Sequence, residues 1–240
     1  MNKKFFNLFL VLLLFLCLTT GCKKKDTTEY TADAYGIVYN SYVAKATVTI
    51  QENKVKKIVI DEALLPSEWA MTDYDKEHDY VVSLNDKKYL KNIKIGDIVL
   101  TFKNNNDRVS YTNDTIQSLE LYLADEKNAK WYYDSLYNNK ITIVDDSNNL
   151  ITDLKFATTK LFKSVASYWP KDENTLGWRE NISELIKGME ETNLSVEPKK
   201  DENGKVVFDK VTTKATLTGY MEYYKLAKAA FDNATKLMKK

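Results

Sequence analysis

Alternating apolar and polar residues predict a β-hairpin early in the chain. From Ala44 to Ile50 every second residue is alanine, valine or isoleucine, and the residues between them are lysine or threonine. A period of two residues is typical of a strand with one buried face. The polar residues 51–54 predict a turn, and the β-branched residues of 55–61 predict the returning strand.

The rest of the chain predicts short strands first and helices later. Further strands are expected at 80–84, 98–102, 141–144 and 206–208, with loops or turns at 104–107, 145–149 and 202–205. Apolar residues at helical spacing predict helices over 113–137, 154–168 and 181–189, and a last helix that begins at Thr218 or Gly219. Because strands and helices do not alternate regularly, we expect an α+β fold in which helices pack on an antiparallel sheet.

The first residues have the pattern of an export signal. A short basic start precedes a nearly unbroken apolar run over 5–18, and Gly21-Cys22 follows. That run is short for the ~30 Å of hydrocarbon in a membrane, so we expect a cleaved signal peptide over 1–21. A cysteine after small residues resembles the box of bacterial lipoproteins, which implies lipidation of Cys22 and anchoring at the outer face of the cell membrane. The alternative is an ordinary signal peptide with an incidental cysteine.

Composition narrows the chemistry of the mature chain. The polar residues 22–34 predict a lipid-anchored tether to a domain over 35–240. The chain has 35 basic and 34 acidic residues. It therefore lacks the excess of basic residues that is typical of a nucleic-acid binder. Cys22 is the one cysteine outside the signal peptide, and His78 is the one histidine. These counts argue against a catalytic triad or a zinc site and favour a binding or carrier role, with chemistry supplied by a cofactor.

A threonine-rich segment directly precedes the last predicted helix. It reads Asp209-Lys210-Val211-Thr212-Thr213-Lys214-Ala215-Thr216-Leu217-Thr218. Small residues at a helix start let backbone N–H groups approach a phosphate, and the helix dipole favours an anion there. The threonine hydroxyls add hydrogen-bond donors. The plainer interpretation is a threonine-rich cap before an amphipathic helix.

This segment, together with the hairpin region over 35–61, resembles the FMN-binding domain of bacterial surface lipoproteins. That family is related to a peripheral subunit of the sodium-pumping quinone reductase. Its signature is an Asp, two residues, and then Ser/Thr-Gly-Ala-Thr/Ser before a helix. Thr213-Lys214-Ala215-Thr216 occupies the tetrad, with Lys214 in place of glycine and with Asp209 one residue further away. The resemblance implies that Thr216 receives FMN through a phosphoester, with help from a flavin transferase, and Lys214 is then expected to pair with the phosphate.

The resemblance implies a membrane-anchored flavoprotein that exchanges electrons with a redox partner, rather than a turnover enzyme. The alternative is a flavin-free surface lipoprotein that acts as a ligand-binding or adhesion module. The two hypotheses differ at 209–218. A flavin protein needs Thr216 exposed at a pocket, with Asp209, Thr213, Ala215 and Thr218 around the cofactor, whereas a scaffold uses the segment as a helix cap.

Two other groups of residues are expected to be structural. The aromatic clusters at 131–133 and 220–224 have helical spacing, which is typical of a core. Asp145-Asp146 and Asp153 lack the spacing of a calcium-binding loop and are expected in a solvated turn. No metal site is therefore predicted.

Overall fold

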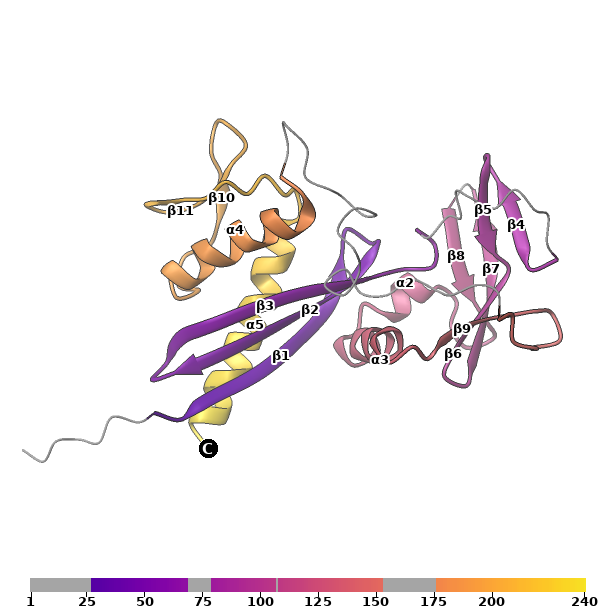
Figure 1. Cartoon of the computed structure of the whole chain (residues 1–240), viewed down its shortest axis with the longest axis horizontal. Coiled ribbons are helices and arrows are strands. Elements are labelled where there is room, and N and C mark those ends of the chain that lie inside the picture. Colours follow the sequence, from indigo (N-terminus) through magenta and orange to yellow (C-terminus); the bar gives the residue numbers. More distant parts are fainter. Residues whose placement is uncertain (1–26, 69–78, 107, 153–175) are drawn as a thin grey trace, which may run out of the picture.

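The computed structural model of the chain describes residues 27–68, 79–106, 108–152 and 176–240. The expected α+β fold is confirmed: helices pack on antiparallel sheets (Figure 1). The helix predicted at 154–168, together with Cys22, His78 and Asp153, lies outside the described residues.

A three-stranded antiparallel sheet organises the fold. Its strands are β1 (Glu29–Val38), β2 (Tyr42–Gln51) and β3 (Lys54–Leu64), in the order β1-β2-β3. The predicted hairpin is confirmed, and Glu52 and Asn53 form its turn with positive φ values of 51° and 61°. Two such residues give the tight turn whose twist matches the flanking strands. β1 begins at Glu29 and not near Tyr35, because the polar residues before Tyr35 pair with β2 through their backbones.

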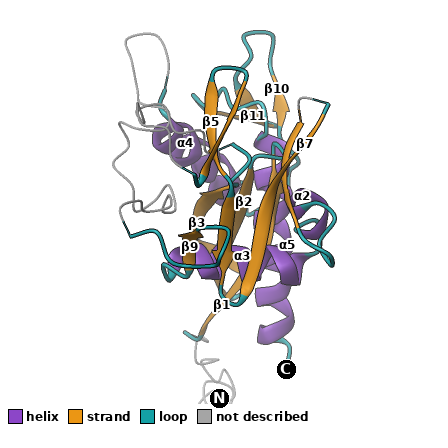
Figure 2. Ribbon diagram, turned by 90° about the vertical axis from the view of Figure 1, so that its right-hand side faces the viewer, coloured by secondary structure: helices purple, strands orange, loops and turns teal. Residues whose placement is uncertain are grey.

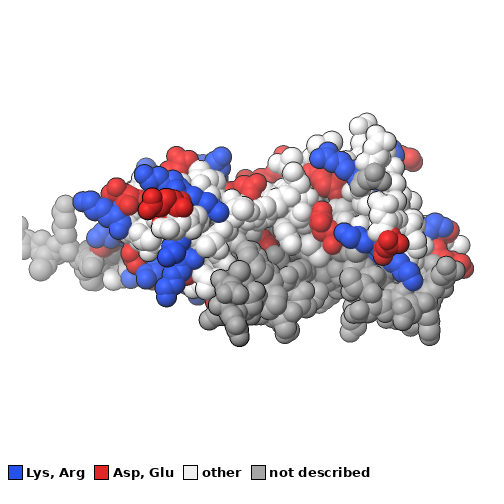
Figure 3. All heavy atoms as spheres, turned by 90° about the horizontal axis from the view of Figure 1, so that it is seen from above, with Lys and Arg blue, Asp and Glu red and all other residues white. Residues whose placement is uncertain are grey.

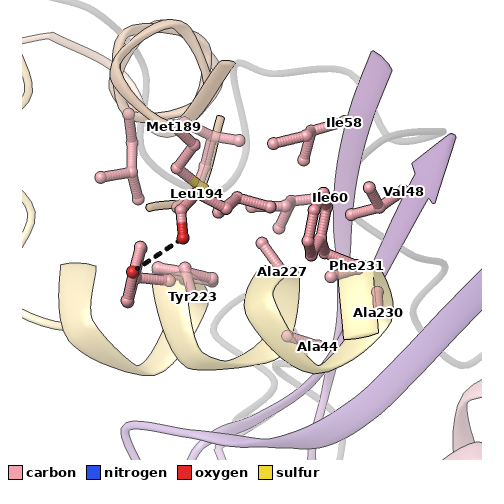
Figure 4. Close-up of a cluster of buried hydrophobic side chains, with 14 of the residues drawn as sticks. Ala44, Val48, Ile58, Ile60, Met189, Leu194, Tyr223, Ala227, Ala230 and Phe231 are labelled. Atoms are coloured by element: carbon pink, nitrogen blue, oxygen red, sulfur yellow. Dashed lines mark hydrogen bonds between the residues drawn. The ribbon is translucent and has the colours of Figure 1, made fainter. Parts of the chain in front are cut away.

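Helices α5 (Tyr220–Met238) and α4 (Trp178–Glu191) cover one face of this sheet. The predicted inward residues of β2, from Ala44 to Ile50, are all 0 % exposed. Ala44 of β2 faces Ala227 and Ala230 of α5, with Val48, Ile58 and Ile60 beside them (Figure 4). Small residues on both sides let the helix backbone lie close to the sheet.

Helix α3 (Glu126–Tyr137) covers the other face of the sheet and leads to a second apolar core. This core also contains a four-stranded sheet in the order β8-β7-β6-β9, made of Arg108–Thr112, Ile98–Asn105, Asn92–Ile95 and Ile141–Val144. A two-stranded sheet of β4 (Val81–Leu84) and β5 (Lys87–Leu90) adjoins it. The three-stranded sheet therefore carries a packed helix on each face.

The helix predicted over 113–137 is two helices. α2 (Leu119–Tyr122) ends before Asp125, whose carboxylate accepts hydrogen bonds from the N–H groups of Lys127 and Asn128 at the start of α3. Such a cap satisfies N–H groups that a new helix leaves without an internal partner. The prediction of one helix was wrong because apolar spacing alone does not reveal a cap between two helices.

The aromatic clusters lie in the two cores, as predicted. Tyr132 and Tyr223 are 0 % exposed, and Tyr133 and Tyr224 are also buried. On the face shown in Figure 3, basic and acidic side chains lie side by side at both ends of the molecule. None of the helices in the described ranges is long and apolar enough to span a membrane.

A third, small sheet packs against α4. It consists of β10 (Lys199–Lys200), β11 (Val206–Phe208) and β12 (Val211–Thr212). It lies at the end of the molecule away from the C-terminus of α5 (Figure 2). The chain then passes directly from β12 into the segment that precedes α5.

Gly188 of α4 tests how tightly this small sheet packs. A Cβ atom at Gly188 would lie 2.4 Å from the ring of Phe208 and 3.0 Å from Cγ2 of Thr213. We expect Gly188→Ala to destabilise the protein by about 1–3 kcal/mol, because overpacking in a fully buried site outweighs the gain of about 1 kcal/mol in helix propensity. The measurement is the free energy of unfolding in urea. Ser183→Ala, at an exposed position of α4, is the control and should not destabilise. Unchanged stability of Gly188→Ala would show that Phe208 can move aside.

Candidate functional site

The threonine-rich segment runs from β12 to α5 with side chains that alternate between the core and the solvent. Thr213, Ala215, Leu217 and Gly219 are buried. The side chains between them form an exposed row, called here the outward row, which consists of Thr212, Lys214, Thr216 and Thr218. The row ends at the first turn of α5, where a helix favours negative charge.

The buried members of the tetrad attach the segment to the small sheet. The Thr213 hydroxyl donates to the carbonyl oxygen of Val206 at 2.7 Å and accepts from the N–H of Ala215 at 3.1 Å. Ala215 is 0 % exposed and its carbonyl accepts from the N–H of Val206. Thr213 and Ala215, expected beside the cofactor, thus direct their side chains into the protein and position the exposed residues.

Asn181 of α4 fixes Thr216. Its side-chain oxygen accepts from the N–H of Thr216 at 2.8 Å and from the Thr216 hydroxyl at 3.3 Å. Its amide nitrogen donates to the carbonyls of Leu176 and Gly177. Asn181 is 0 % exposed, and a buried amide with several partners holds the groups around it rigidly. The sequence offered no sign of this role, because Asn181 only marked the start of a predicted helix.

A lysine that sequence reasoning missed lies next to Thr216. Lys200 of β10 donates from Nζ to the carbonyl oxygen of Thr216 at 3.1 Å. Lys214 is exposed in the outward row, and its backbone N–H donates to the Glu184 carboxylate at 2.9 Å. Two ammonium groups and the Glu184 carboxylate thus accompany the exposed hydroxyls, and a second carboxylate, Glu222, lies in the first turn of α5. Asp209 is not part of this group: it lies exposed in the turn between β11 and β12, with a φ of 51°.

Tyr39 closes the N-terminus of α5. The N–H of Gly219 donates to the Tyr39 hydroxyl at 2.5 Å, and the Thr218 hydroxyl lies 3.3 Å from the same oxygen. A Cβ atom at Gly219 would lie 2.5 Å from Cζ of Tyr39, so any larger residue would have to displace the Tyr39 ring. Tyr39 has a φ of 57° in the turn between β1 and β2, and a bulky residue rarely adopts this conformation.

The backbone N–H groups of the tetrad are already used within the protein. Those of Thr213, Lys214, Ala215 and Thr216 donate to Val206, Glu184, Thr213 and Asn181. The sequence predicted that such groups would approach a phosphate. In this structure a phosphate would instead meet the threonine hydroxyls, the ammonium groups and the first turn of α5.

A buried carboxylate lies beneath this site. The Tyr223 hydroxyl donates to Oε2 of Glu62 at 2.5 Å, and Glu62 is 0 % exposed. Burial raises the pKa of Tyr42 to about 12, with a further contribution from the negative charges of Glu62 and Glu68. Burial and the Glu62 charge also raise the pKa of Tyr223. Both phenols therefore stay protonated, and that of Tyr223 donates its hydrogen bond to Glu62.

The structure also contains a cavity that the sequence did not suggest. It lies between the α3 side of the three-stranded sheet and the C-terminal half of α3, and its volume is about 430 Å³. In the register of β2 and β3, Lys45 lies opposite Asp61 and Thr47 lies opposite Val59. These four residues form the floor, α3 supplies Tyr133, Asp134 and Tyr137, and Asn138 follows at the C-terminal cap of that helix. Alternation alone placed Lys45 and Thr47 on a polar face, but not under a helix.

An ion pair anchors the floor of this cavity. Nζ of Lys45 lies 3.1 Å from Oδ2 of Asp33, and the Thr47 hydroxyl donates to Oδ1 of Asp33 at 2.6 Å. Burial alone would raise the pKa of Asp33, but the hydrogen bonds from Thr47 and Lys45 and the Lys45 charge outweigh it and lower that pKa. Burial likewise opposes the charge of Lys45, but Asp33 outweighs it and raises the Lys45 pKa.

The lowered pKa of Asp33 makes part of the stability depend on pH. A carboxyl whose pKa is lower in the folded state stabilises the protein above its unfolded pKa and loses this effect as the pH falls through the folded pKa. We expect Asp33→Asn to lower the free energy of unfolding by about 0.5–1 kcal/mol near neutral pH, a modest value because the pair is partly exposed. The difference from the wild type should shrink below about pH 4. Urea unfolding at both pH values measures it.

Asp114→Asn is the control for Asp33→Asn, because Asp114 is an exposed loop residue. It should change stability little at either pH. A loss in Asp33→Asn that stays constant with pH would contradict the assignment of the ion pair.

In the part of the chain that the structure describes, no group of three or more His, Cys, Asp or Glu residues is arranged to hold a metal ion. Comparisons of the chain with protein-family models, curated proteins and solved structures give no match.

Proposed function

We propose that this chain is a membrane-anchored lipoprotein, lipidated at Cys22, that binds FMN outside the cytoplasmic membrane and carries electrons. The observation that carries the proposal is the outward row, which presents Lys214, Thr216 and Thr218 directly before α5. It supports the resemblance of 209–218 to the FMN-binding signature, because the residue aligned with the acceptor threonine is exposed and held in place.

The residues of this site fit the phosphate end of FMN. Thr216 and Thr218 offer hydroxyl groups, and the ammonium groups of Lys200 and Lys214 offer positive charge. Hydrogen bonds between charged partners are shorter and stronger than those between neutral ones. The first turn of α5 adds its dipole, which favours an anion. Glu184 opposes this charge in part, since its carboxylate contacts the backbone of Lys214.

Each part of the site has a separate task in this proposal. Asn181 holds the backbone and hydroxyl of Thr216, and the buried Thr213 and Ala215 fix the segment to the small sheet. Tyr39 sets the position of the α5 N-terminus through Gly219. The flavin, when bound, supplies the redox chemistry. The chain holds and orients the flavin. This division of tasks suits a protein whose single histidine leaves it few catalytic side chains of its own.

A second candidate function is a flavin-free surface lipoprotein that binds another ligand. The engaged N–H groups of the tetrad favour this alternative, because a segment whose backbone is satisfied internally is also a stable helix cap. The two functions make different predictions for FMN.

Covalent attachment can be tested at Thr216. When the full chain is co-expressed with a flavin transferase, we expect mass spectrometry to find FMN on the peptide that contains Thr216, and we expect Thr216→Ala to lose the label completely. Thr212→Ala is the matched control, because Thr212 is exposed in the same outward row. Flavin on another residue, or none in the wild type, would contradict covalent attachment at Thr216.

Binding without a covalent bond can be tested with the two lysines. We expect Lys200→Ala and Lys214→Ala each to weaken FMN binding by about tenfold or more, because a charge-assisted hydrogen bond contributes roughly 1.5–3 kcal/mol. Quenching of flavin fluorescence measures the affinity. Lys210→Ala, in the exposed turn before β12, should bind like the wild type. If all three variants bound FMN with the affinity of the wild type, the phosphate would not bind at this site. If the wild type bound no FMN at saturating concentration, the flavin-free function would be favoured.

A further inference from the structure

The cavity under α3 has the features of a second ligand site, on the opposite face of the sheet from the outward row. Lys45, Thr47, Val59 and Asp61 come from the face that packs against α3. Thr213, Ala215 and α5 belong to the core on the other face. A volume of about 430 Å³ lies within the range of small-molecule sites, roughly 300–1,000 Å³. The cavity is therefore large enough for a small-molecule ligand, and it is separate from the proposed flavin site.

The two lysines beside the cavity each pair with a carboxylate. Lys45 pairs with Asp33, and Nζ of Lys130 lies 2.5 Å from the Asp134 carboxylate. Asp61 is opposite Lys45 in the strand register and accepts a hydrogen bond from the Tyr133 hydroxyl at 2.7 Å. A free anion would meet the carboxylates of Asp61 and Asp134. This arrangement disfavours an anionic ligand, because both ammonium groups already have carboxylate partners.

Lysines also lie over two of the tyrosine rings beside the cavity. Nζ of Lys45 lies 5.6 Å from the ring centroid of Tyr35 and 5.8 Å from that of Tyr133. Nζ of Lys130 lies 5.0 Å from the Tyr35 ring. Cation–π contacts act within about 6 Å, so these two rings already have cationic partners from the chain itself.

Several polar groups that line the cavity offer hydrogen-bond acceptors. The Thr47 hydroxyl gives its proton to Asp33, which leaves its oxygen as an acceptor. Asp134 contributes a carboxylate, and Asn138 contributes an amide oxygen at the C-terminus of α3. The buried Asp61 carboxylate already accepts from the N–H of Glu62 and the hydroxyl of Tyr133, and its remaining lone pairs can accept from a ligand. A ligand that suits this lining carries several donors. Hydroxyl groups provide donors without charge.

One wall of the cavity is a flat aromatic surface. Tyr137 is 49 % exposed, and its ring is stacked on Tyr133 with a centroid distance of 6.2 Å and an interplanar angle of 18°. The C–H groups on one face of a sugar ring pack well on the electron-rich face of an aromatic ring. An aromatic wall beside acceptor groups suits a molecule that has one apolar face and hydroxyl groups at its edge.

From these observations we propose that the cavity between β2, β3 and α3 binds a neutral saccharide, which stacks on Tyr137 and donates hydroxyl hydrogen bonds to Asp61 and Asn138. The site is independent of the proposed flavin site. Whether or not the cavity binds a saccharide, the flavin proposal is unchanged.

The test is saturation-transfer NMR on the full chain in a detergent without a sugar headgroup. The probes are glucose, galactose, mannose, N-acetylglucosamine and their disaccharides, with glycine betaine and proline as zwitterionic probes of similar size. We expect transfer to at least one saccharide and a preference over the zwitterions. Transfer to none of the saccharides at millimolar concentration, or a preference for a zwitterion, would overturn the proposal.

Variants then locate the bound sugar. Tyr137→Ala should weaken binding by about two- to tenfold because it removes the aromatic wall, whereas Tyr137→Phe keeps the ring and should bind like the wild type. Asp61→Asn should weaken binding by about tenfold through loss of a charged acceptor. Lys127→Ala, exposed in the first turn of α3, is the control. Because Asp61 is buried, circular dichroism is used to check that the Asp61→Asn variant is folded. If it is not, the Tyr137→Ala variant still decides the test, because Tyr137 is exposed. Wild-type affinity in Tyr137→Ala would place the sugar elsewhere and overturn the proposal.

Discussion

The close packing of α5 on the small residues of the three-stranded sheet is the contact on which the rest of the structure depends. Ala44 and Ala46 of β2 lie in the same core as Ala227 and Ala230 of α5, and all four are 0 % exposed. Larger side chains here would push the helix away, because protein cores are packed as densely as organic crystals. The position of α5 in turn fixes Gly219, and so the segment that carries Thr216. The candidate flavin site therefore depends on alanines that never touch it.

The two faces of the same sheet are used differently. Its α5 face is apolar and forms the larger core, whereas its α3 face combines Tyr35 and Val43 with the charged Lys45 and Asp61. A strand sends successive side chains to opposite faces, so β2 contributes alanines to one face and Lys45 and Thr47 to the other. A partly buried charge is stabilised when it is paired, and Asp33 provides the partner for Lys45. One strand thus supports both a helix–sheet core and a polar cavity.

Much of the fold follows from local patterns in the sequence. The hairpin, the short strands at 98–102 and 141–144, and the last helix were predicted because each shows its own periodicity or a turn. The first half of β1 was missed because a polar strand held by backbone pairing shows no such pattern. The break before α3 depends on the Asp125 cap, which apolar spacing does not reveal.

The candidate site likewise contains a part that the sequence predicted and a part that it did not. The sequence singled out 209–218 and the helix after it, and the outward row lies there. Asn181, Lys200 and Tyr39 reach this segment from three distant parts of the chain. The cavity likewise combines β2 and β3 with α3, far apart in sequence. Contacts of this kind depend on tertiary packing, and a single sequence carries no pattern for them.

The central claim is that the outward row and the start of α5 hold a flavin phosphate. A titration of the full chain in detergent with FMN, followed by amide NMR, tests it most directly, because each backbone N–H reports separately. The account predicts that the shifts change most at 212–222 and at Lys200, with little change at Lys45, Asp61 and Tyr137. An unchanged spectrum at saturating FMN, or changes confined to the cavity under α3, would contradict it.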